Sequence, residues 1–394
     1  LGSINSQIIW DPNKKCMVDP TGQCVQNAIL TAVPFLRINP DARSGGMGDA
    51  GLATSPDPNA MHYNESKLVF ADEDVSIAAT YTPWLRNLGI QDIYIAYLTG
   101  YAKVDDLQAV GFGLRYFSLG DIPFTDENGQ PLGEGRPNEF EVEAGYARKL
   151  SSKLSASLAA KYIYSNLAAD FVVNGNEIKA GQAFAADIGI TYKTPWRFSG
   201  RENQLTIGAA ITNLGSKIGY TDSTEPQDRE FLPGNIGVGA ALDMDLDEYN
   251  SFTVTFDINK FLVPSPNPNV ETYDEDGNGV PDFRERSFFE GTFGSLADAE
   301  GGFNEELQEL MYSFGVEYWY DKQFAVRMGY FSEHRFKGNR KYLTMGIGLK
   351  YNVFGINMSY LVPTSNLQSP LANTLRFSLI FDFEAFNYSE EEDQ

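Results

Sequence analysis

The last apolar stretch of the chain, residues 374–386, places the strongest constraint on the fold. Its large apolar side chains occupy alternate positions: Leu375, Phe377, Leu379, Phe381 and Phe383. The positions between them are mostly polar, with one apolar exception: Arg376, Ser378, Ile380, Asp382 and Glu384. Period-two alternation of this length indicates a β-strand with one apolar face. That face needs either a second sheet or lipid beside it, and the many repeats of the pattern favour lipid.

Composition agrees with a membrane β-barrel rather than a helical membrane protein. The mean hydropathy of the 394 residues is −0.29 and no run approaches 18 apolar residues, which excludes a transmembrane helix. Aromatic residues make up 13 %, which is too much apolar surface for a disordered chain. The net charge of −23 argues against nucleic acid as a partner, because so acidic a chain repels phosphate.

Fourteen segments from residue 75 onward have strand character, so we predict an all-β fold, a 14-stranded antiparallel transmembrane barrel. The predicted strands are 75–82, 90–101, 107–119, 138–149, 153–164, 183–193, 203–212, 234–243, 251–261, 311–320, 323–333, 341–351, 354–362 and 374–384. Connections after even strands are short and those after odd strands are mostly long. This asymmetry predicts periplasmic short turns, extracellular long loops and two periplasmic termini in an outer membrane. Tryptophans at strand ends suit interfacial girdles or, alternatively, core packing: Trp84, Trp196 and Trp319.

The chain divides into a barrel and three other segments. Residues 1–70 are rich in proline and glycine, which prevents regular strand pairing, and we predict a periplasmic or plug segment there. Residues 75–386 form the predicted barrel, 262–310 its long extracellular loop, and 387–394 an acidic tail. Glycines recur on the inward face of the strands. The space they leave suits either a lumen for a hydrophobic ligand or the plug.

Cys16 and Cys24 are the two cysteines of the chain and lie eight residues apart. Their closeness predicts a small disulfide loop formed in an oxidising compartment, with two unrelated thiols as the alternative. Leu1 onward lacks the basic and apolar regions of a signal peptide, so we expect a mature, processed chain.

The longest loop contains a candidate calcium site. Residues 274–285 satisfy the D-x-[DN]-x-[DN]-G-x5-E pattern, which supplies hard oxygen ligands around a sharp turn at glycine. The candidate ligands are Asp274, Asp276, Asn278, Val280 through its carbonyl, Asp282 through water, and Glu285. Pro281 departs from the helix–loop–helix form. The alternative is an acidic, turn-rich, solvated loop.

Signals for catalysis are poor. The two histidines, His62 and His334, lie far apart in the sequence, and neither G-x-S-x-G nor H-E-x-x-H occurs. We therefore expect a protein that is not an enzyme, with no catalytic residues and no cofactor other than calcium.

The N-terminal segment carries a family resemblance. Residues 35–54, FLRINPDARSGGMGDAGLAT, followed by 64–67, NESK, resemble the PorV family, the outer-membrane components of the type IX secretion system of Bacteroidetes. The same region is similar, more broadly, to FadL-like barrels, although Asn64-Glu65-Ser66 replaces their Asn-Pro-Ala. FadL-like barrels have fourteen strands and an N-terminal hatch, which agrees with the strand count above.

The resemblance implies a non-enzymatic role in protein secretion. A PorV-like barrel binds the SprA translocon, receives secreted cargo by its C-terminal signal domain, and passes it to the surface attachment complex. The alternative that the broader resemblance implies is a FadL-like transporter of hydrophobic small molecules.

The loop at 262–310 is the best candidate for contacts with a partner, because it holds apolar anchors among acidic residues: Phe288, Phe289 and Phe293. A loop that packs down on the barrel mouth has the same composition, and the sequence does not separate the two.

Overall fold

In the part of the chain that the computed structural model describes, strands dominate. The described residues are 9–18, 22–25, 27–85, 90, 92–125, 130–168, 172–173, 176–198, 201–266, 280–364 and 373–383. No helix among them is long and apolar enough to cross a membrane.

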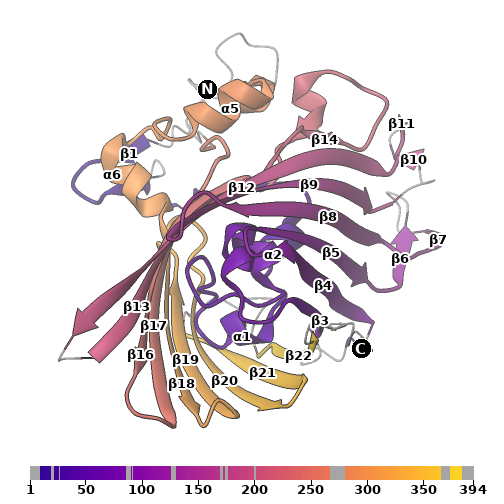
Figure 1. The fold of residues 1–394 in the computed structure, drawn as a ribbon. Helices are drawn as coiled ribbons and strands as arrows, with labels where there is room; N and C mark the ends of the chain where they lie inside the picture. The colour runs from indigo at the N-terminus through magenta and orange to yellow at the C-terminus, as the bar shows by residue number, and fades with distance from the viewer. Residues whose placement is uncertain are drawn as a thin grey trace, which may run out of the picture.

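Fourteen antiparallel strands form one closed barrel, in which each strand pairs with its neighbours along the chain (Figure 1). The strands are β3 (Val75–Pro83), β4 (Ile93–Asp105), β5 (Gln108–Leu119), β8 (Asn138–Lys149), β9 (Leu154–Asn166), β12 (Gly181–Phe198), β13 (Arg201–Gly215), β16 (Asn235–Asp245), β17 (Asn250–Phe261), β18 (Met311–Tyr320), β19 (Phe324–Ser332), β20 (Lys341–Tyr351), β21 (Phe354–Pro363) and β22 (Leu375–Phe383). Pairing of β22 with β3 closes the ring, from Phe383 opposite Val75 to Phe377 opposite Tyr81. All fourteen predicted strands are confirmed.

Side chains alternate across the wall as the sequence pattern predicts. On β20, Leu343, Met345 and Ile347 are 44–49 % exposed on the outside, whereas Thr344 between them is fully buried inside. On β22 the outward Leu375, Phe377 and Leu379 are 38–46 % exposed. An apolar outer face around a polar interior is the arrangement of a membrane β-barrel.

The remaining elements are short. Those of the N-terminal region are β1 (Ile9–Asp11), β2 (Cys16–Val18), η1 (Pro34–Arg37), α1 (Ala42–Gly45), α2 (Ala60–Tyr63) and η2 (Glu65–Phe70). The connections hold β6 (Ile122–Thr125), β7 (Pro131–Gly135), β10 (Val172–Val173), β11 (Asn176–Glu177), β14 (Ile218–Gly219), η4 (Pro226–Asp228), β15 (Arg229–Glu230), α4 (Asp282–Glu285), α5 (Phe288–Gly294), α6 (Phe303–Glu306) and η5 (Leu307–Glu309). The helices and hairpins of the connections lie at one end of the barrel, which we call the long-loop mouth. The other end is the short-turn mouth.

Residues 34–71, which we call the inner segment, lie inside the ring of strands (Figure 1). Backbone amides of this segment donate hydrogen bonds to inward side chains of the wall. Ala42 N donates to Ser378 Oγ at 3.0 Å and Gly48 N to Thr344 Oγ1 at 2.8 Å. Gly51 N donates to Asp257 Oδ2 at 2.7 Å. Polar inward residues of the strands therefore satisfy backbone groups that would otherwise be buried without partners.

Inward glycines of the strands make room for the inner segment. A Cβ atom at Gly329 would lie 2.0 Å from Gly48 N, and one at Gly208 would lie 2.2 Å from the Leu52 carbonyl oxygen. Both distances are shorter than any van der Waals contact, so the two backbones meet only because a side chain is missing. Of the two uses for the inward glycines, contact with the N-terminal segment is the one observed.

The interior holds two apolar clusters and a set of buried charged side chains. An apolar cluster lies near the long-loop mouth and includes Phe35, Leu36, Phe117, Phe231 and Phe331. A smaller apolar cluster lies near the short-turn mouth and includes Met61, Leu68, Val69, Tyr101 and Ala147. Charged side chains that are at least nine-tenths buried also lie inside the ring, among them Arg43, Lys161, Asp187, Glu317 and Arg327.

The N-terminal residues lie at a different mouth from the one that strand parity suggested. Asn27 N donates to the Phe336 carbonyl in the connection between β19 and β20, at the long-loop mouth. The inner segment then runs down the barrel and joins β3 at the short-turn mouth, beside the end of β22. The first and last described residues are therefore at opposite mouths, because the segment before β3 crosses the barrel from one side to the other.

Two of the three tryptophans also differ from the girdle expectation. Trp84 packs against the apolar cluster inside the barrel, with its ring 5.2 Å from that of Phe117. Trp319 lies beneath the Arg327 guanidinium, 5.4 Å from ring centroid to Cζ. Trp196 is 43 % exposed.

Candidate functional site

The long loop is fixed to the barrel rim by buried ion pairs. Lys337 Nζ lies 2.6 Å from Glu305 Oε1 and 3.0 Å from Glu309 Oε1. Lys260, at the end of β17, contacts Glu309 and lies 2.9 Å from Glu306 Oε2. All five side chains are at least nine-tenths buried or close to it. Buried charges in pairs hold their partners firmly, because separation would leave each charge unpaired.

Electrostatics around Glu309 favour its ionised carboxylate. Burial alone would raise the pKa of Glu309, but the nearby Lys337 and Lys260 ammoniums outweigh it and hold the pKa below its usual range. Because this pKa is lower in the folded state than in the unfolded chain, the ionised Glu309 stabilises the fold at pH values above the ordinary carboxyl pKa. That stabilisation is lost as the pH falls through the lowered pKa. The anchor is thus intact at neutral pH.

A second anchor joins the loop to its neighbour between β13 and β16. Lys217 Nζ donates to the Arg284 carbonyl at 2.6 Å and to the Pro226 carbonyl at 2.7 Å. Burial lowers the pKa of Lys217 to about 8, and Glu230 opposes part of that shift. Since both acceptors are carbonyls, this amine bridges two loops whether it is charged or neutral.

Helix α5 has two unlike faces. Gly291 and Thr292 are buried, and a Cβ at Gly291 would lie 2.4 Å from the Phe231 ring of the apolar cluster. Phe289 and Phe293, four residues apart and therefore on one helix face, are 70 % and 54 % exposed. Phe288 is half-buried and its ring contacts that of Phe289. The loop therefore both packs on the mouth and presents two phenylalanines outward.

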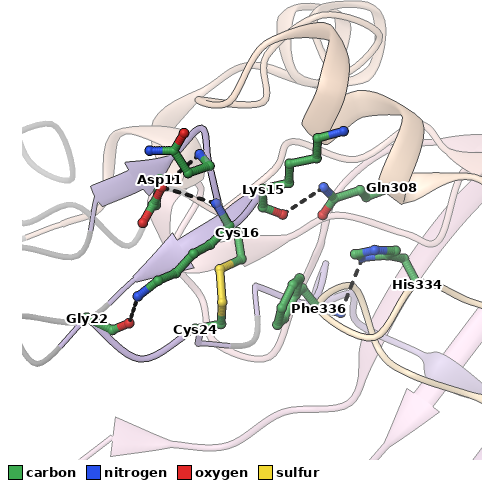
Figure 2. The surroundings of a disulfide bond; sticks show 10 residues. Asp11, Lys15, Cys16, Gly22, Cys24, Gln308, His334 and Phe336 are labelled. Atoms are coloured by element: carbon green, nitrogen blue, oxygen red, sulfur yellow. Dashed lines mark hydrogen bonds between the residues drawn. A yellow bond between two sulfur atoms is a disulfide. The ribbon is translucent and has the colours of Figure 1, made fainter.

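The N-terminal hairpin carries the disulfide and lies against the same loop (Figure 2). Cys16 Sγ and Cys24 Sγ are bonded, and β1 pairs with β2 just before the bond. Gln308 Nε2 donates to the Lys15 carbonyl at 2.9 Å, and Asn27 Nδ2 donates to Glu305 Oε1 at 3.0 Å. Hairpin and loop together form one cap over the long-loop mouth.

We expect that replacing both cysteines with serine loosens the hairpin and leaves the barrel folded. The bond closes a short chain segment, and the loop-entropy relation gives about 2–3 kcal/mol for a loop of this size. Limited proteolysis should then cut within residues 9–25 faster than in the parent protein. The heat-dependent shift in electrophoretic mobility that reports a folded barrel should be unchanged; its loss would contradict the expectation.

Part of the predicted calcium loop lies outside the described residues, namely Asp274, Asp276 and Asn278. Val280 precedes α4, while Asp282 and Glu285 are the first and last residues of that helix. Calcium binding at 274–285 therefore stays a prediction.

The two histidines are in different surroundings. His62 lies inside the barrel with Nδ1 2.6 Å from Arg115 Nη2, and His334 lies at the long-loop mouth, where its Nδ1 accepts from Phe336 N. The structure does not bring the two rings together.

Sequence reasoning missed the ion pairs that join the inner segment to the wall. Glu317 on β18 accepts hydrogen bonds from Arg43 of α1, at 2.8 and 3.0 Å, and from Arg327 of β19, at 2.5 Å. Arg43 also lies 2.9 Å from Asp57 Oδ2. The available signal was that Glu317 and Arg327 are charged residues at inward positions of alternating strands.

Among the described residues, two modest cavities lie beside the inner segment. One, of about 120 Å³, lies below the apolar cluster and is lined in part by Leu36, His62 and Tyr342. The other, of about 250 Å³, lies toward the short-turn mouth and is lined in part by Trp319 and Lys350.

Comparison with known proteins gives one matching family and several solved structures of low sequence identity. The family model for the type IX secretion system protein PorV matches residues 21–268. A TodX deltaS2S3 mutant monoaromatic hydrocarbon channel is 13 % identical, with 87 % of this chain and 98 % of that chain covered and a TM-score of 0.49. The Ralstonia pickettii toluene transporter TbuX is also 13 % identical, with 88 % and 98 % covered and a TM-score of 0.49. A Pseudomonas aeruginosa FadL homologue is 11 % identical, with 91 % and 100 % covered and a TM-score of 0.41. No curated protein matches the chain.

A closed barrel with an apolar outer face, an internal N-terminal segment and a capped long-loop mouth defines an outer-membrane β-barrel protein. The match over more than half of its length shows which one: the chain belongs to the PorV family of type IX secretion system proteins.

Proposed function

We propose that this barrel is a non-enzymatic carrier of the type IX secretion system. It binds the SprA translocon, receives secreted cargo by the C-terminal signal domain, and delivers it to the surface attachment complex. Membership of the family supports a role in the type IX secretion system. The exposed face of α5 supports binding to another protein. Phenylalanines held outward on a firmly anchored base resemble the apolar anchors of protein interfaces.

In this proposal the long-loop mouth faces the cell exterior and lipid surrounds the barrel wall. The inner segment acts as a plug, and residues 75–386 act as the barrel domain that carries the cap. Buried contacts between the inner segment and β17, β20 and β22 support a plug that stays in place.

Two cavities among the described residues support this role over transport of hydrophobic small molecules. Sites for such ligands usually enclose about 300–1,000 Å³ with mostly apolar walls. The two cavities here are smaller, at about 120 and 250 Å³, and charged residues line both. A transporter would need the inner segment to move.

The test is affinity purification from native membranes of the parent protein and of a Phe289→Ser/Phe293→Ser variant. Loss of two exposed aromatic anchors should lower recovery of the translocon or of cargo by about tenfold or more. Leu150→Ser is the matched control, because Leu150 is 62 % exposed in a short turn at the other mouth.

Unchanged recovery of both partners would remove α5 from the interface. Recovery of the barrel with bound lipid and no protein partner would favour the transporter instead.

A further inference from the structure

Four buried carboxylates surround one lysine where the inner segment meets the wall. Glu65 belongs to η2 of the inner segment, Glu141 and Glu143 to β8, and Asp187 to β12. Each is at most 1 % exposed. Lys161 of β9 lies 2.7 Å from Asp187 Oδ2 and 3.7 Å from an oxygen of each β8 glutamate. If all five side chains are ionised, three negative charges remain uncompensated in a buried site.

Three of the carboxylates converge on a single point. One oxygen each from Glu65, Glu143 and Asp187 lies within 4.8 Å of the others. Ca²⁺ binds oxygen at 2.3–2.6 Å, so oxygens on opposite sides of the ion are up to about 5 Å apart. Mg²⁺, at 2.0–2.1 Å, would need them within about 4 Å. Separations within 4.8 Å are compatible with calcium, whose flexible coordination also tolerates irregular sites better than that of magnesium.

Hydrogen bonds to one oxygen orient two of the three carboxylates, those of Glu65 and Asp187. Ser157 Oγ donates to Glu65 Oε2 at 2.9 Å, and Asn213 N donates to Asp187 Oδ1 at 2.7 Å. Such outer contacts are what orient carboxylate ligands around metals. The second oxygen of Asp187 lies 2.7 Å from Lys161 Nζ, and the second oxygen of Glu65 accepts no hydrogen bond from a described residue.

Independent support comes from oxygens that have no hydrogen-bond donor among the described residues. Glu65 Oε1, both oxygens of Glu143 and both oxygens of Glu141 are buried and accept no hydrogen bond. Burial of an ionised carboxylate without a donor or a cation costs several kcal/mol. The Lys161 ammonium contacts Asp187, and at 3.7 Å it is too far from Glu141 and Glu143 for hydrogen bonds.

We propose that Glu65, Glu143 and Asp187 bind one Ca²⁺ ion inside the barrel, with Glu141 in reach as a further ligand. The ion joins the inner segment to β8 and β12, on the side of the barrel opposite the Glu317 ion pairs. Its effect is to fasten the inner segment to the wall.

The experiment uses the full chain in detergent, stripped with chelator. Asp274→Asn/Asp276→Asn removes the candidate loop site, so that any remaining calcium is bound elsewhere. Calcium bound per barrel is measured after gel filtration, together with the rate of proteolysis of the inner segment with and without calcium.

In the loop variant, about one calcium should remain per barrel, and calcium should slow cleavage by about tenfold or more, since a ligand that binds only the folded state stabilises it. Adding Glu143→Gln, which keeps the shape of the side chain, should abolish both effects. Glu139→Gln is the matched control: Glu139 is an inward, buried glutamate on the same strand, but it pairs with Ser165 away from the cluster.

Absence of bound calcium and of calcium-dependent protection in the loop variant would overturn the proposal, and protons would then neutralise the cluster. Equal effects of Glu139→Gln and Glu143→Gln would overturn it too. The electrophoretic mobility shift of each variant shows that the barrel is folded.

Discussion

Replacing Glu317 with alanine should destabilise the protein by about 3–5 kcal/mol, because it leaves two buried guanidinium groups without their shared carboxylate. Arg43 and Arg327 are both at least nine-tenths buried and both donate to Glu317. Arg43 keeps Asp57 and Arg327 keeps Asn357 as partners, but neither partner replaces the charge between them.

The measurement is the free energy of unfolding by urea in detergent micelles, with protease added to report release of the inner segment. Because Arg43 belongs to the inner segment and Arg327 to the wall, the loss should appear first as cleavage near Arg43. Glu248→Ala, in an exposed turn, is the control and should change nothing. A Glu317→Ala protein as stable and as protease-resistant as its parent would show that the cluster contributes no net stability.

Replacing Gly329 with alanine should displace the inner segment from β19. The new Cβ would lie 2.0 Å from Gly48 N and 2.1 Å from the Met47 carbonyl carbon. Both are backbone atoms that no rotamer change can move away. Overpacking of a core costs about 1–3 kcal/mol when side chains adjust, and here the backbone itself must shift.

Protease protection of residues 46–48 should fall while the barrel stays closed, because the strand pairing of Gly329 does not depend on its side chain. Gly294→Ala is the matched control, since its Cβ would have no neighbour within 4 Å. Equal protection in both variants would mean that the wall yields rather than the inner segment.

The barrel was predictable because strand periodicity is local. Alternation such as that of Leu375, Phe377 and Leu379 can be recognised without knowing the neighbouring strands, and the parity of loop lengths indicated which connections share a mouth. Strand limits were less accurate at β12 and β13, which continue beyond the residues with clean alternation.

The interior was not predictable in the same way, because its contacts join residues distant in sequence. A glycine at position 329 does not indicate which segment fills the space that it leaves. The sequence around Glu317 likewise does not indicate that Arg43 is its partner. The parity of loop lengths indicates at which mouth each strand begins and ends. It does not predict the path of the segment that precedes the first strand. The position of a tryptophan at a strand end does not show whether its side chain faces lipid, as in an interfacial girdle, or the interior, as Trp84 does.

The path of the N-terminal region constrains how the inner segment could leave the barrel. At the short-turn mouth the segment continues into β3, whose pairing with β22 closes the ring. At the long-loop mouth the hairpin before it is bonded to the long loop, through Gln308 and the Lys15 carbonyl and through Asn27 and Glu305. The segment is therefore held at both ends, and its exit from the ring would require one end to detach.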